Sequence, residues 1–165
     1  MTIQEMGAVG EMIGGIAVIF TLIYLTLQIR QNTRAVRLNT GHAVTEEFRG
    51  MFELVAGSSD LAELISKAAD TDASINGADK VRYWCYTSNF IYAFENAYFQ
   101  WVQEALDSNK WAGMKRMVTD YAHLPGFEEY WRNRKHWYSE NFQHFMDTDL
   151  LQSEAKGGVP LPGEY

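Results

Sequence analysis

The residues MIGGIAVIFTLIYLTLQI, from Met12 to Ile29, decide the architecture of this chain. They contain no charged side chain, and Arg30 follows them immediately. An α-helix rises roughly 1.5 Å per residue, so this stretch spans about 27 Å, close to the hydrocarbon thickness of a bilayer. The stretch therefore predicts a transmembrane helix. The alternative is a buried core helix, but in so small a domain such a helix normally carries a polar stripe.

The charges that flank this stretch predict its orientation. No lysine or arginine precedes it, whereas Arg30, Arg34 and Arg37 follow it within two turns. A cleaved signal peptide has basic residues before its apolar run, so we expect an anchor that stays in place. The positive-inside rule places the N-terminus outside and residues 30–165 in the cytoplasm, with the anchor in a bacterial inner membrane. The same arginines are expected to contact anionic lipid headgroups.

Small side chains recur along one face of the same helix at intervals of three and four residues. This small-residue face consists of Gly7, Gly10, Gly14, Ala17 and Thr21. Small residues let a second helix approach closely, which favours association of helices in lipid. The mean spacing of 3.5 residues indicates a left-handed crossing. We expect the face to contact a second copy of the chain or another membrane protein; the alternative is the ordinary frequency of glycine in membrane helices.

Composition divides the chain into three parts. Residues 1–41 are expected to form the transmembrane helix and its juxtamembrane extension, with a kink or short break near Gly41. Residues 42–150 are expected to form a helical domain, and residues 151–165 a disordered tail. A net charge of −7 without a basic patch beyond the arginine run argues against nucleic acid as a partner. Cys85 is the single cysteine, which excludes an internal disulfide and suits a reducing cytoplasm.

The fold class expected for the whole chain is all-α. Apolar residues between 42 and 150 recur at three- and four-residue steps, and polar or Pro-Gly turns interrupt them. These turns predict a four- or five-helix cytoplasmic bundle around a long central helix over residues 78–106. Between Val81 and Val102 the only charged residues are Arg82 and Glu95, and aromatic side chains surround most of the helix. A helix of this kind is expected to be covered on nearly all sides.

Glu95 is the ionisable group that most needs an explanation. Its helical neighbours at three and four residues are all apolar or aromatic. A carboxylate in such surroundings has to be paired, hydrogen-bonded or protonated. We favour a structural pair with Arg49, Arg132 or Arg134, or with tyrosine hydroxyls. A ligand-binding or acid–base role, and exposure at an unfilled interface, are the alternatives.

His136, Glu140 and His144 have a four-residue spacing that would place three metal-capable side chains on one face of an unbroken helix. Ser139 interrupts that pattern, and no second cluster of acidic residues and histidines has the spacing of a di-iron bundle. Zinc-protease, CxxC, phosphate-loop, nucleophile-elbow and dinucleotide-binding motifs are absent from the sequence. We therefore expect no metal, cofactor or catalytic residue.

Aromatic residues make up 14% of the chain and are concentrated between Tyr83 and Phe145. Aromatic side chains bury large areas and often form the core of a small bundle. The alternative is an aromatic-lined pocket for a lipid, a quinone or another apolar ligand.

Five segments carry a resemblance to a known group of proteins. They are YLTLQIRQNTRAVR (24–37), FENAYFQWVQEALD (94–107), Trp111, LPGFEEYW (124–131) and YSENFQHF (138–145). With them the chain resembles uncharacterised bacterial single-pass membrane proteins that have a YLxLQIRxNT-type juxtamembrane motif. The resemblance implies one N-terminal membrane helix and a helical cytoplasmic domain, and it brings no functional residue with it.

Three functions are compatible with these features. The first is a membrane-anchored interaction or accessory module that self-assembles or docks on a larger membrane complex. The second is a sensor or carrier that binds an apolar ligand among the aromatic side chains. The third is an enzyme that uses Glu95.

Overall fold

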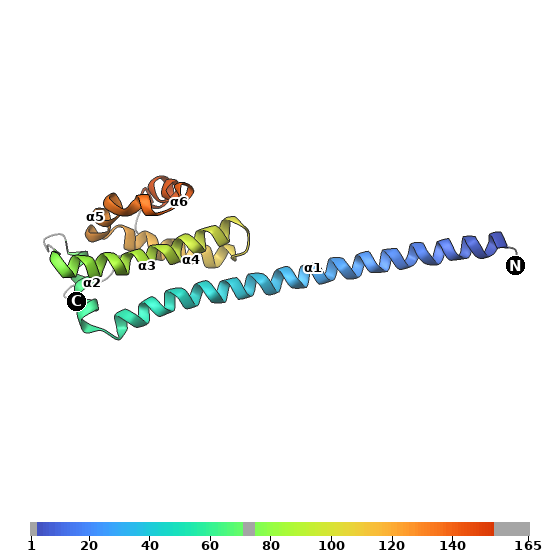
Figure 1. The fold of residues 1–165 in the computed structure, drawn as a ribbon, viewed down its shortest axis with the longest axis horizontal. Coiled ribbons are helices and arrows are strands. Elements are labelled where there is room, and N and C mark those ends of the chain that lie inside the picture. The colour runs from blue at the N-terminus through green and yellow to red at the C-terminus, as the bar shows by residue number, and fades with distance from the viewer. Residues whose placement is uncertain (1–2, 71–74, 154–165) are drawn as a thin grey trace. The chain divides into compact units, whose positions relative to one another are not determined.

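The computed structural model describes residues 3–70 and 75–153, without the side chains of residues 4–6, 8 and 9. Every regular element in these residues is helical, which confirms the all-α prediction. Residues 154–165, most of the predicted disordered tail, lie outside the described part. The α-helices are α1 (Ile3–Ala56), α2 (Ser59–Ala69), α3 (Gly77–Val102), α4 (Ser108–Ala122), α5 (Pro125–Arg134) and α6 (Glu140–Phe145), shown in Figure 1.

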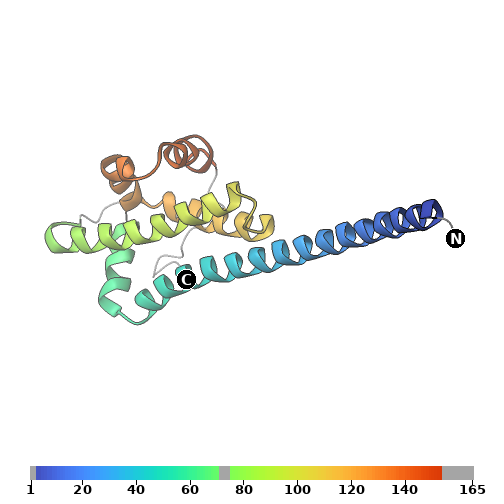
Figure 2. The same ribbon diagram turned by 45° about the vertical axis from the view of Figure 1, so that its right-hand side comes forward.

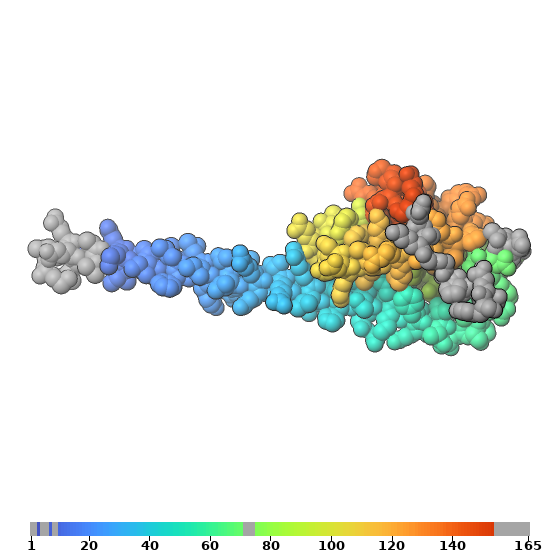
Figure 3. Space-filling view, turned by 180° about the vertical axis from the view of Figure 1, so that it is seen from behind, coloured from blue at the N-terminus to red at the C-terminus, as the bar shows by residue number. Residues whose placement is uncertain are grey.

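The chain divides into two compact units, Met1–Asn39 and Thr40–Tyr165, and each is described by itself. The first unit is the N-terminal part of α1. All of its described side chains are exposed, and the space-filling view shows it as a single helical column (Figure 3). Thr21 Oγ1 donates to the Ala17 carbonyl at 2.9 Å, and Thr26 Oγ1 donates to the Leu22 carbonyl at 2.8 Å. The hydroxyls of both threonines are thus satisfied within the helix.

The second unit begins with the last turns of α1, where the helix passes through Gly41 without interruption. The short break predicted near Gly41 is therefore wrong, whereas the alternative, a kink, stays a prediction. The Gly41 carbonyl accepts a hydrogen bond from Lys110 Nζ at 3.2 Å and another from Thr45 Oγ1 at 2.7 Å. A Cβ atom at Gly41 would lie 3.1 Å from Lys110 Nζ. Glycine at this position lets the Lys110 side chain approach the backbone, and it does not end the helix.

Helix α1 ends at Ala56, and α2 follows after a tight turn. Val44 and Phe48 of α1 are buried, and the ring of Phe48 meets that of Phe90 edge-on, with 5.4 Å between the centroids. Ser58 is the N-cap of α2, because its hydroxyl accepts from the Leu61 amide. Figure 2 shows α2 running at a steep angle to α3.

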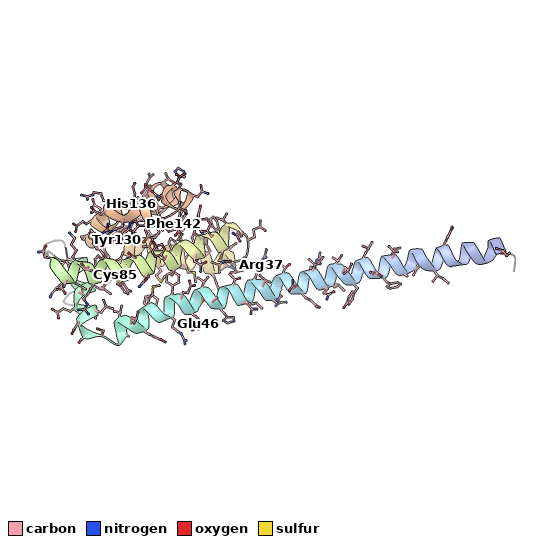
Figure 4. All side chains as sticks on the ribbon, viewed as in Figure 1. Arg37, Glu46, Cys85, Tyr130, His136 and Phe142 are labelled. Carbon is pink, nitrogen blue, oxygen red and sulfur yellow. The ribbon has the colours of Figure 1, made fainter. Side chains whose placement is uncertain are left out.

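Helix α3 buries one broad face at the centre of the second unit. Phe94 is fully buried there, and its ring stacks on that of Trp111 at 5.2 Å between centroids. The prediction that α3 is covered on nearly all sides is wrong, however. An exposed stripe with steps of three and four residues runs along it, and Figure 4 labels one member, Cys85. The stripe comprises Arg82, Cys85, Asn89, Tyr92 and Asn96.

Helix α3 ends at Val102 and does not reach Leu106, the predicted end. Glu104 adopts a left-handed conformation with φ of 57°, which the helix interior excludes. The amides of Ala105 and Leu106 both donate to the Gln100 carbonyl. This turn directs the Leu106 side chain into the core, where only 3% of it is exposed. A carbonyl-capping turn of this kind is a common helix ending.

The remaining helices complete the core beside α3. The Asp107 carboxylate caps α4 by accepting from the Asn109 and Lys110 amides. Pro125 starts α5 at a position where a missing amide hydrogen costs nothing. Figure 4 shows Tyr130 of α5 and Phe142 of α6 between their own helices and α3. After α6, a π-helical turn covers Met146–Leu150.

Candidate functional site

The strongest candidate for a functional surface is the apolar segment Met12–Ile29 of α1. Its large apolar side chains are between 45% exposed, at Leu25, and 67% exposed, at Phe20. Burying a side chain of this size stabilises a protein by roughly 1.5–3 kcal/mol. Within the described part of the chain, these side chains stay exposed and gain none of this stabilisation.

The membrane-spanning potential of α1 can be judged from length, composition and burial. Within the described residues, α1 from Gly10 onward is the one helix long and apolar enough to cross a bilayer. None of its most apolar eighteen-residue window is buried within the chain. A core helix of a soluble domain would bury most of such a window.

The glycines of the small-residue face have open space beside them in the described part of the chain. A Cβ atom added at Gly7, Gly10 or Gly14 would meet nothing within 4 Å, and the same is true of Gly15, which lies outside the face. Each glycine in a helix interior costs about 1 kcal/mol relative to alanine. Ala17 and Thr21 continue the face and are also exposed. Among the described residues, no atom from outside the helix backbone lies within 4 Å of a Cβ built at these three glycines of the face.

The three arginines after the apolar segment are also exposed. Arg30, Arg34 and Arg37 follow one another at four and three residues, and this spacing places them on one side of α1. A guanidinium on a long, flexible stem can reach phosphate oxygens at the edge of a bilayer. Their contact with headgroups stays a prediction.

Glu95 has a partner that the sequence did not indicate. Its Oε1 atom accepts from both the amide and the hydroxyl of Ser139, each at 2.8 Å. The expected arginines have other contacts: Arg132 pairs with Glu128, and Arg134 stacks on the rings of two tryptophans. Ser139 is the N-cap of α6. The carboxylate therefore fixes the start of α6 against α3.

Glu95 variants distinguish this structural role from a catalytic one. A glutamine keeps an oxygen that accepts both hydrogen bonds, so Glu95→Gln is expected to change the free energy of unfolding by less than about 1 kcal/mol. Glu95→Ala leaves the Ser139 donors without their partner and is expected to cost about 2–3 kcal/mol. Urea unfolding of the full chain in detergent measures both values. Glu53→Ala, at an exposed carboxylate, is the control, and equal losses in the Gln and Ala variants of Glu95 would contradict the structural role.

The histidine pattern near the C-terminus does not form one helical face. His136 lies in a 3-10 turn (Lys135–Trp137), whereas Glu140 and His144 lie in α6. Between them Ser139 is extended, with ψ of 148°. Across residues 3–70 and 75–153, no group of three histidine, cysteine, aspartate or glutamate side chains is placed to hold a metal ion.

Hydroxyl groups in the core pair with one another. The Thr87 and Tyr121 hydroxyls are 2.8 Å apart, and the Tyr130 hydroxyl hydrogen-bonds to both Ser88 and Tyr138. Burial raises the pKa of Tyr121 and Tyr138 well above the ordinary tyrosine value. These phenols therefore stay protonated at neutral pH, as structural hydrogen-bonding groups do.

The aromatic side chains of the core mostly contact each other. The rings of Trp101 and Trp111 stack with centroids 4.9 Å apart, and those of Tyr98 and Phe145 stack at 4.8 Å. Ring pairs at such distances add about 0.5–1.5 kcal/mol beyond the area they bury. These ring contacts are the packing expected of a hydrophobic core. An apolar ligand among them stays a prediction.

No protein-family model, curated protein or solved structure matches this chain in the comparisons made.

Proposed function

We propose that the chain is a single-pass membrane protein that acts as an interaction or accessory module. The segment Met12–Ile29 anchors it in a bacterial inner membrane, and the small-residue face of the anchor binds a second copy of the chain or another membrane protein. The helical domain is held in the cytoplasm. The observation that carries the proposal is that the apolar segment is exposed around its whole circumference.

Hydrogen bonding within the anchor supports placing it in lipid. A bilayer core has no water to satisfy polar groups, so every hydroxyl there needs a partner within the protein. Thr21 and Thr26 each donate to a carbonyl of the preceding turn. The polar side chains of the two threonines are thus compatible with a lipid environment.

The open space along the glycines supports an intermolecular contact. Helices in lipid associate through close backbone approach, and a glycine face permits that approach. Among the residues that the structure describes, Gly10 and Gly14 have no neighbour that would require a glycine. Close packing of a partner helix would explain why glycines occupy these positions.

Cys85 offers a direct test of anchoring and orientation, because it is the single cysteine and its side chain is exposed. Spheroplasts that express the full chain are treated with a membrane-impermeant maleimide. We expect Cys85 to stay unlabelled in intact spheroplasts and to be labelled after permeabilisation with detergent. The matched control, Thr2→Cys in a Cys85→Ser background, places the thiol before the anchor and is expected to be labelled in intact spheroplasts.

Two results would contradict the proposal. Labelling of Cys85 in intact spheroplasts would reverse the orientation. Recovery of the chain in the soluble fraction after an alkaline carbonate wash of the membranes would show that Met12–Ile29 does not anchor it in the bilayer.

A further inference from the structure

Gly41 is the first buried position along the described part of α1. The described side chains before Thr40 are all exposed, and the side chain of Val44, about one turn after Gly41, is buried in the core of the second unit. In Figure 4 this turn lies between the labelled residues Arg37 and Glu46. Gly41 therefore marks the place where α1 joins the packed helices of the second unit.

The ammonium group of Lys110 contacts this turn of α1 from the side. Lys110 lies in the first turn of α4, and its Nζ atom donates to the Gly41 carbonyl at 3.2 Å. The other lysines of the described residues each form an ion pair with a carboxylate: Lys67 with Glu63, Lys80 with Glu129, Lys115 with Asp149 and Lys135 with Asp147. Lys110 differs from them because its charge is directed at a backbone carbonyl of another helix.

The Gly41 carbonyl has more donors than an ordinary helix carbonyl. Besides Lys110 Nζ, it accepts a hydrogen bond from the Thr45 hydroxyl at 2.7 Å. In an α-helix the Thr45 amide is directed at the same oxygen. A carbonyl oxygen has two lone pairs, so three donors compete for it. Side-chain donors that enter the backbone ladder in this way are a recognised cause of helix bending, so this turn is a weak point of α1.

The glycine itself adds freedom at the same place. Glycine is the least favourable residue in a helix interior after proline, because its backbone has the most freedom to lose. The absence of a side chain is also what admits the lysine, since a Cβ atom at Gly41 would lie 3.1 Å from Lys110 Nζ and 3.3 Å from Lys110 Cδ. The contact with Lys110 thus supports the turn that the glycine weakens.

We propose that Gly41 is a hinge in α1 and that the hydrogen bond from Lys110, which we call the latch, holds this hinge closed. With the latch formed, α1 runs through Gly41 as one helix. Loss of the charge on Lys110 opens the turn at Gly41 and lets α1 bend there, while Val44 and Phe48 stay buried in the core. This device does not depend on the membrane role proposed above, because Gly41 and Lys110 both belong to the second unit.

Hydrogen–deuterium exchange of the full chain in detergent, measured by mass spectrometry with fragmentation that resolves single amides, tests the latch. Lys110→Met keeps the length of the side chain and removes its donor. We expect the amides of residues 43–46 to exchange at least five-fold faster than in the wild type, and those of α3 to keep their wild-type rates. Lys115→Met, which removes an exposed ion pair with Asp149 from the same helix, is the matched control and is expected to leave residues 43–46 unchanged.

A second substitution tests whether the opening occurs at Gly41. In the Lys110→Met background, Gly41→Ala raises the helix propensity of the turn, and the flexible end of the methionine can move away from the new Cβ atom. We expect exchange at residues 43–46 to return to within two-fold of the wild-type rate. If the rate stayed high, the hinge would not be at Gly41.

Three results would overturn the latch. The first is unchanged exchange at residues 43–46 in Lys110→Met. The second is equal acceleration in Lys115→Met, because any loss of positive charge from α4 would then have the same effect. The third is faster exchange throughout α3 and α4 in Lys110→Met, because the lysine would then stabilise the whole domain and not one turn of α1.

Discussion

Replacing Gly10 and Gly14 together with leucine is expected to turn the assembled protein into a monomer. Each leucine would place a branched side chain where the small-residue face now allows two helix backbones to approach. Both positions have open space within the chain, so the substitutions should leave the fold of the monomer intact. We expect the apparent association constant in nanodiscs to fall at least ten-fold, as measured by native mass spectrometry after release from the lipid.

Gly15→Leu is the matched control for this experiment. Gly15 is also in open space, but it lies about 100° around the helix from Gly14 and outside the small-residue face. It is expected to keep the wild-type distribution of oligomers or bound subunits. Equal loss of assembly in Gly15→Leu and in the double variant would show that bulk anywhere on the helix disrupts association. If neither Gly15→Leu nor the double variant lost assembly, the small-residue face would not be the contact surface.

The parts of the fold that depend on neighbouring residues could be predicted from the sequence. The all-α class follows from the three- and four-residue periodicity of apolar side chains. The short break expected near Gly41 was wrong because a glycine in a helical sequence can have either of two roles. It can end a helix, or it can admit a side chain from a distant helix, and here that side chain belongs to Lys110.

Among the candidate sites, too, local sequence features could be predicted and features that depend on tertiary packing could not. The exposed segment Met12–Ile29 could be found from composition alone, because a charge-free run of that length stands out in the sequence. The partner of Glu95 could not, since Ser139 lies forty-four positions away and only tertiary packing brings the two together.

Phe94→Ala is expected to produce the largest loss of stability in the second unit. Phe94 is fully buried, and its ring meets those of Trp111, Phe142 and Phe145 at centroid distances of 5.2, 5.9 and 6.3 Å. Removing a buried phenyl ring costs about 3–5 kcal/mol, because the cavity left behind closes only in part. Urea unfolding followed by tryptophan fluorescence, with the full chain in detergent, measures this loss.

Phe52→Ala is the matched control, since Phe52 is 50% exposed on the last turns of α1 and alanine suits a helix well. It is expected to cost less than about 1 kcal/mol. A loss of similar size in both variants would mean that the aromatic cluster around α3 is not the stabilising core. The Phe94→Ala variant should still assemble through the small-residue face, because that face belongs to the first unit and Phe94 to the second. Loss of assembly in Phe94→Ala would place the contact surface on the helical domain.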